Sequence, residues 1–217
     1  MNSMSTHPFR LDVVAHAGLG LAAGVSSAFF AVIAARLGAS PWLLALITGG
    51  PYLTNLLAPA WAAQAHQMGT RWLVVGSLIA AAVLLFVGMA QPALSFALLV
   101  VLYHLFYGVS DPLYVAMAEI VYPERTGTSL GRMEAVFNTA HALASGVAGW
   151  LMDLWAMRFV SAIAALSTSM AAAAYVPFPD MPRTDSSAEA SHWHFVRQDG
   201  VLRRMLLVLW WRARARL

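Results

Sequence analysis

The chain has 217 residues, of which 60% are hydrophobic and only 11% are charged, and its mean hydropathy is +0.67. Because about a quarter of the residues in a soluble domain are charged, this composition excludes an ordinary water-soluble protein. The sequence has no cysteine, which excludes disulfides and thiolate metal sites. Its 13 basic residues are all arginines that lie scattered between apolar runs, so we expect no nucleic-acid partner despite a pI near 9.7.

Six long apolar runs follow one another along the chain. A helix needs about 20 residues to cross the hydrocarbon of a bilayer, and the runs lack the period-two alternation of barrel strands. The first run is also too long for a secretory signal peptide. We therefore predict an all-α integral membrane bundle of six helices within residues 1–178. The predicted spans are 13–35, 42–64, 72–90, 94–118, 135–152 and 159–177.

The placement of arginines predicts the orientation of the bundle. If the N-terminus is cytoplasmic, the cytoplasmic segments as far as residue 204 hold eight arginines, whereas the external loops hold only Arg36 and Arg158. Cytoplasmic loops carry the excess of basic residues in multi-pass proteins. We therefore expect a multi-pass protein of the cell membrane, in a bacterial inner membrane, with its N-terminus in the cytoplasm.

The composition changes after the sixth run. Residues 179–204 are polar and rich in Asp, Ser and Pro, which predicts a cytoplasmic linker. Residues 205–217 begin with a short apolar stretch and end in an arginine-rich sequence. We favour the start of a truncated seventh span, and an amphipathic tail held by anionic lipid is the alternative.

Polar side chains inside the predicted spans gather on single helix faces. In the fourth span, His104, Tyr107, Asp111 and Tyr114 are spaced so that they share one face. The first, second and fifth spans have similar polar faces, whereas the third and sixth offer only serines and one threonine. Polar groups in a membrane are costly and usually functional, although interhelical hydrogen bonding is the alternative. The candidates for a substrate or proton pathway are Asp111, His104, Tyr107, Asn138, His141, Asn55 and Tyr52.

Three stretches resemble the major facilitator superfamily of transporters. The first is Leu37–Ser40, followed by a second span that contains Gly and Pro. The second is the loop after that span, which keeps Gly69 and Arg71 of the hallmark pattern and has Ala62, His66 and Gln67 at its other positions. The third runs from Gly108 and Pro112 through Glu119 and Pro123 to Arg125, Gly127 and Gly131, with His104 where many members carry arginine.

This resemblance implies the architecture and activity of the family. Helices one, two, four and five would line a central cavity, and helices three and six would face lipid. The implied function is secondary active transport of a small solute by alternating access. Charges at the inner face could form a latch of ion pairs, or they could be solvated loop charges. The loop gating candidates are Gly69, Arg71, Glu119, Arg125, Gly127, Gly131 and Arg132, with Glu124 and Glu134 beside them.

The length allows only one six-helix half of such a transporter. We favour a truncated half, and a homodimer of two halves is the alternative. A non-transporting assembly or receptor subunit is a further alternative. An intramembrane enzyme is disfavoured because the sequence has no His-Glu-x-x-His and no Gly-x-Ser-x-Gly. We expect the lipid bilayer and a small solute as partners, and no catalytic residues, metal or cofactor. With Asp111 and no arginine inside a span, a strongly anionic solute is disfavoured.

Overall fold

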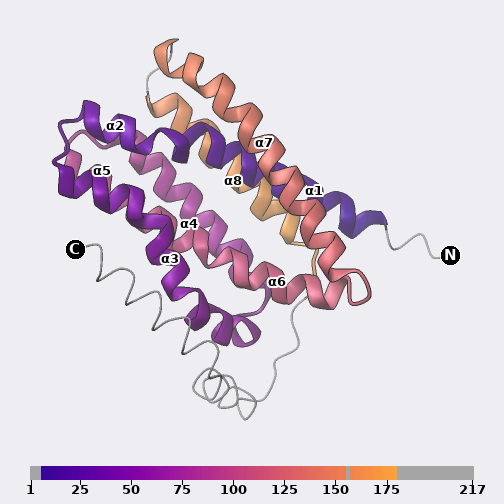
Figure 1. Ribbon diagram of the computed structural model, residues 1–217. Helices are drawn as coiled ribbons and strands as arrows, with labels where there is room; N and C mark the ends of the chain where they lie inside the picture. The colour runs from indigo at the N-terminus through magenta and orange to yellow at the C-terminus, as the bar shows by residue number, and fades with distance from the viewer. Residues whose placement is uncertain (1–5, 155–156, 180–217) are drawn as a thin grey trace, which may run out of the picture. The chain divides into compact units, whose positions relative to one another are not determined.

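The computed structural model describes residues 6–154 and 157–179; at 6–7, 58–60, 62–68 and 151–154 it describes the backbone alone. Every regular element in these ranges is helical (Figure 1), which confirms the predicted all-α class. The predicted linker beyond residue 179 and the predicted tail at 205–217 lie outside the described residues. The helices are α1 (Thr6–Ser26), η2 (Ser27–Phe29), α2 (Phe30–Arg36), α3 (Pro41–Met68), α4 (Thr70–Met89), α5 (Ala93–Gly108), α6 (Ser110–Val121), α7 (Thr126–Leu154) and α8 (Met157–Tyr175).

The first predicted span is a single rod with a bend. The α-helix tightens into one 3-10 turn, η2, between α1 and α2. The hydroxyls of Ser26 and Ser27 donate to the carbonyls of Ala22 and Ala23, each at 2.6 Å. Such bonds to the preceding turn compete with the helical ladder and bend a helix. The rod ends where Gly38 takes a φ of 75° and the amide of Ala39 bonds to the carbonyl of Ala34, a glycine-dependent helix termination.

The fourth predicted span is also one rod with a break, between α5 and α6 at Val109. Pro112 has no backbone N–H, so it cannot donate to the carbonyl of Gly108 four residues earlier. The break falls at that missing bond. Gly108 itself packs against α3, because a Cβ there would overlap the side chain of Thr54. A glycine and a proline together therefore set the angle at which this rod passes α3.

Four of the described segments are long and apolar enough to cross a membrane: Pro8–Arg36, Thr70–Met89, Ala93–Val121 and Met157–Tyr175. The remaining two helices, α3 with 28 residues and α7 with 29, also exceed the length of about 20 that a bilayer requires. The first segment starts earlier than the predicted residue 13, so the helix includes Asp12. We excluded that position because of its charge, but the side chain is buried among polar partners rather than exposed to lipid.

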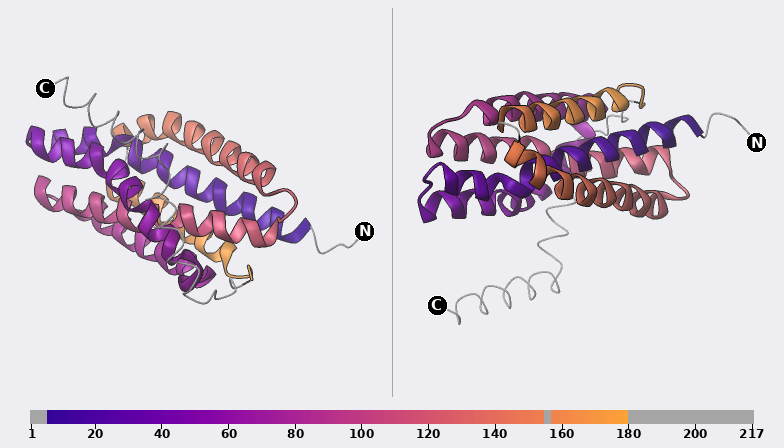
Figure 2. Two further views of the ribbon diagram at one scale, coloured as in Figure 1. Left: turned by 60° about the horizontal axis from the view of Figure 1, so that its bottom comes forward. Right: turned by 90° about the horizontal axis from the view of Figure 1, so that it is seen from above.

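The rods pack against one another in an order that differs from their order in the sequence. Helix α1 packs against both α7 and α8, α8 packs against α4, α4 packs against α5, and α5 packs against α3. Figure 1 and Figure 2 show α1 lying alongside α7. The two helices lie so close together that a Cβ at Gly20 or Gly24 would collide with a backbone carbonyl of α7. The absence of a side chain at these glycines allows this contact. The second parts of the two broken rods add further contacts, since α2 packs against α3, and α6 packs against both α3 and α7.

Candidate functional site

Two cavities lie inside the described bundle and meet at the α5–α6 rod. Cavity 1, of about 500 Å³, is lined from α1–η2–α2, α3, α5–α6 and α7. Cavity 2, of about 600 Å³, lies between α1, α6 and α7, with one residue each from α4, α5 and α8. Three residues line both cavities: Tyr107, Asp111 and Phe137. The four predicted spans with polar faces therefore supply nearly all of the lining.

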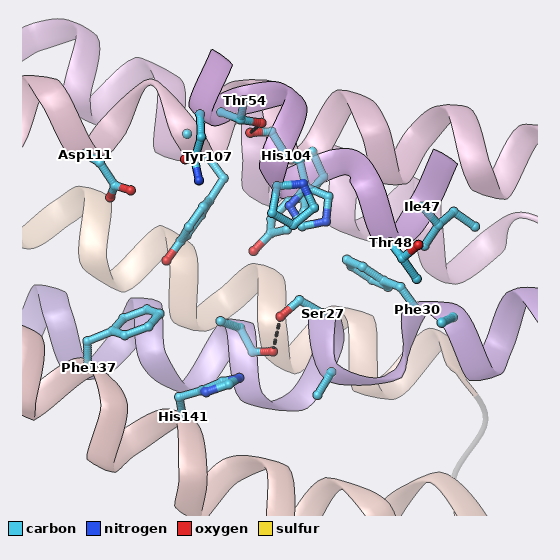
Figure 3. Close-up of a pocket in the computed structure, with 17 residues that line it drawn as sticks. Ser27, Phe30, Ile47, Thr48, Thr54, His104, Tyr107, Asp111, Phe137 and His141 are labelled. Carbon is cyan, nitrogen blue, oxygen red and sulfur yellow. Dashed lines mark hydrogen bonds between the residues drawn. The ribbon is translucent and has the colours of Figure 1, made fainter. Parts of the chain in front are cut away.

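The walls of cavity 1 are aromatic and polar. Figure 3 shows His104 and Tyr107 extending into the space from one side and Phe137 and His141 facing them from α7. The rings of Phe137 and His141 are stacked, with centroids 6.0 Å apart. His104 is buried over Gly50 and meets Phe30 edge to face at 5.9 Å. His104 therefore packs as part of the wall and presents little of its ring to the cavity.

The negative charge of the lining is concentrated where the cavities meet. The Asp111 side chain is exposed to the cavities. It interacts electrostatically with Glu134 of α7 and His16 of α1, and both of these residues line cavity 2. The lining of the two cavities, as far as the chain is described, contains two carboxylates and no arginine. An electronegative, aromatic-walled site of this kind suits a neutral or positively charged solute.

The structure brings five of the seven pathway candidates to cavity 1: Asn55, His104, Tyr107, Asp111 and His141. The other two lie elsewhere. Tyr52 is 73% exposed and lines neither cavity, because Pro51 and Asn55 occupy the inward face of α3. Asn138 is exposed on α7 and donates to Glu134 at 2.8 Å.

The loop candidates lie around the ends of α3, α6 and α7. Gly69 begins α4 with a φ of 70°, and Arg71 follows it in the first turn. Gly131 lines cavity 2. Glu119, Glu124, Arg125, Gly127 and Arg132 are exposed. Glu119 lies in α6, Glu124 and Arg125 in the turn after it, and Arg132 in α7. Between the described residues, no ion pair joins Glu119 or Glu124 to Arg125 or Arg132.

The sequence reasoning missed Asp12. Its side chain is 0% exposed and lies against Tyr114 of α6. The Tyr114 hydroxyl donates to Asp12 Oδ2 at 2.8 Å, and His16 Nδ1 lies 3.2 Å from Oδ1. An acid and a histidine four residues apart occupy one helix face, and this spacing was the available signal. Asp12 lies one residue before the uncharged apolar run that defines the predicted span, so a search for uncharged runs does not include it.

Two tyrosines complete the surroundings of Asp12. Tyr175 of α8 meets the His16 ring edge to face at 6.4 Å. Tyr122 follows α6, and its buried hydroxyl has no hydrogen-bond partner among the described residues. Burial, and then the nearby negative charge of Asp12, raise the pKa of Tyr122. Asp12 is therefore enclosed by polar rings from three separate helical segments.

Long apolar helices around cavities that hold a few polar side chains define a multi-pass membrane protein with the arrangement of a transporter. The sequence matches the Major Facilitator Superfamily over residues 13–213, nearly the whole chain, so the chain belongs to this superfamily. The resemblance seen in the sequence is thereby confirmed. Members of the family are membrane transporters in general rather than enzymes. No curated protein and no solved structure matches the chain.

Proposed function

We propose that this chain is a secondary active transporter half that carries a small, neutral or cationic solute by alternating access. The observation that carries the proposal is the junction of the two cavities at Tyr107 and Asp111, where α1, the α5–α6 rod and α7 contribute to the lining of both. A solute at this point would contact a carboxylate, two aromatic rings and no basic side chain. Transporters of this architecture bind solutes near the middle of the membrane between their repeats.

The orientation is part of the same proposal. The beginnings of α1, α4 and α7 and the end of α8 would face the cytoplasm, in a bacterial inner membrane. The arginine distribution supports this assignment. The Thr70 hydroxyl donates to the Pro179 carbonyl at 2.6 Å, which supports placing the beginning of α4 and the end of α8 on the same side of the membrane. Reporter fusions to the N-terminus and to the α2–α3 loop should report opposite sides of the membrane; the same side for both would contradict the orientation.

Charge selectivity can be tested with two probes of one shape. Tetraphenylphosphonium and tetraphenylborate are aromatic ions that differ in the sign of their charge. We expect the purified chain in detergent to bind the cation more tightly than the anion, after subtraction of binding to empty micelles. The Asp111→Asn variant should bind the cation about tenfold more weakly, equivalent to about 1.4 kcal/mol.

A matched control is Glu124→Gln, which removes one negative charge from an exposed loop residue outside both cavities. It should leave cation binding unchanged. Equal binding of both ions, or equal loss in the two variants, would refute the proposed solute class.

Alternating access requires a second wall that faces the two cavities from outside this bundle. A second copy of this chain or further helices of the same polypeptide would supply it. The mass of the purified protein, corrected for detergent, distinguishes these sources. A dimer supports the homodimer, and a monomer excludes it. Ethidium flux into DNA-loaded proteoliposomes then separates a working transporter from a non-transporting subunit.

A further inference from the structure

We propose that Asp12 and His16 together form a proton-binding site in the wall of cavity 2. The two residues lie one turn apart on α1, with His16 Nδ1 3.2 Å from Asp12 Oδ1. Asp12 is fully buried, whereas the His16 side chain keeps 11% of its surface exposed and lines cavity 2. A proton would therefore enter from the cavity through the imidazole, and the carboxylate lies behind it. On the proposed function this proton would be the coupling ion.

The hydrogen bonding of Asp12 is incomplete for a permanently ionised group. Oδ2 accepts one bond, from Tyr114 at 2.8 Å. Oδ1 has no hydrogen-bond donor among the described residues, because His16 Nδ1 is directed to the Asp12 backbone carbonyl at 3.0 Å. A buried carboxylate normally needs a paired charge and several donors to offset its lost hydration. Among the described residues, Asp12 accepts one bond from Tyr114 and lies near the Tyr122 hydroxyl, but no fixed positive charge pairs with it, so a bound proton would replace the charge that its surroundings lack.

The charge balance of the pair favours one bound proton. With one proton shared between the carboxyl and the imidazole, the pair has no net charge. When that proton leaves through the imidazole to water in cavity 2, a buried negative charge remains. Among the described residues, the groups that face the pair cannot neutralise this charge: they are the hydroxyls of Tyr114, Tyr122 and Tyr175, and the carboxylates of Asp111 and Glu134. Proton release therefore depends on hydration or on a cation in the cavity.

The position of Asp111 connects this site to the cavity junction. Asp111 interacts electrostatically with His16 and lines both cavities. A cationic solute held by Asp111 would repel a proton on His16, and departure of the solute would favour its return. Competition between a proton and a cation for one electronegative region is the physical basis of exchange. No contact outside the cavity wall is required.

Infrared difference spectroscopy of the full chain, purified in detergent, tests the proposal without any solute. Acidification should produce a carboxyl C=O stretching band from a group shielded from water. Asp12→Asn preserves the shape and an acceptor for Tyr114 but cannot bind a proton, so this band should disappear. Asp111→Asn should retain it. The proposal would be overturned if the band persists in Asp12→Asn, or if the wild-type protein shows no such band. Asp12 would then be only a structural link between α1 and α6.

A second measurement covers the case in which Asp12→Asn does not fold. The chain has seven histidines. The imidazole ¹⁵N resonances that disappear from the spectrum of His16→Gln are those of His16. In the wild type the His16 signals should shift with pH together with the carboxyl band. A His16 resonance that is constant while the other signals titrate would refute the shared site. Neither measurement uses transport, so an inactive protein that shows both titrations would refute only the proposed function.

Discussion

Thr54 shows how a single hydroxyl joins two helices beside cavity 1. Its Oγ1 lies 3.1 Å from the carbonyl oxygens of both Gly50 and His104, so its one proton is shared between its own helix and α5. Thr54→Val keeps the shape of the side chain and removes that proton. We expect the free energy of unfolding to fall by about 1 kcal/mol, measured by denaturation with SDS in mixed micelles.

Thr139 supplies the control for this substitution. It is exposed on α7, and its hydroxyl bonds only to the carbonyl of Ala135 one turn earlier, at 2.8 Å. Thr139→Val should therefore change stability much less than Thr54→Val. Equal losses would mean that the bond from Thr54 to α5 contributes nothing of its own.

The sequence predicted individual site residues only where helical spacing determines direction. Asp111 and Tyr107 share a face with His104, and all three reach cavity 1. Tyr52 has the same spacing from Thr48, yet it points away because α3 is turned so that Pro51 and Asn55 face inward. The rotation of a helix about its own axis depends on its neighbours, and the sequence of one helix does not contain it.

At the scale of the helices, the contact between α1 and α7 depends on glycine. A Cβ at Gly24 would collide with the carbonyl oxygen of His141, and the Ser145 hydroxyl donates to the carbonyl of Gly24 at 3.2 Å. Gly24→Ala should separate the two helices and lower the free energy of unfolding by roughly 1–3 kcal/mol, as overpacking does.

Gly146 provides the opposite case on α7. No atom lies within 4 Å of a Cβ added there, so Gly146→Ala gains helix propensity, worth up to about 1 kcal/mol, without a clash. The two substitutions are chemically identical and should change the melting temperature in opposite directions. Destabilisation by both would show that the effect lies in the glycines themselves and not in the contact between α1 and α7.

The existence and type of the helices followed from composition and the length of the apolar runs, whereas their ends did not. The break at Val109 needed both Pro112 and the close packing of Gly108 on Thr54. The early start of α1 needed a partner for Asp12, which Tyr114 provides from 102 residues away. Charge is a reliable signal for a helix end only when nothing distant in the sequence satisfies that charge.

At the scale of the whole molecule, we expect a water-accessible surface at the cavities and a lipid-exposed surface, the lipid face, over α4 and α8. The chain has no cysteine, so single-cysteine variants report each position without interference. Thr48 is exposed and lines cavity 1. Leu85 of α4 is also exposed, at 48%, but lines neither cavity. Exposure alone therefore predicts the same reactivity at both positions, whereas the membrane arrangement predicts different reactivities.

A permanently charged methanethiosulfonate reagent separates these two predictions in proteoliposomes. The reagent reacts with the thiolate, which forms in contact with water and is suppressed in apolar surroundings. We expect the Thr48→Cys variant to be labelled readily and the Leu85→Cys variant to remain unlabelled until SDS removes the lipid, when both should react. Rapid labelling of Leu85→Cys in liposomes would place α4 against water and contradict the lipid face. Protection of Thr48→Cys that SDS relieves would instead mean that a facing wall covers cavity 1, the state that alternating access requires in half of its cycle.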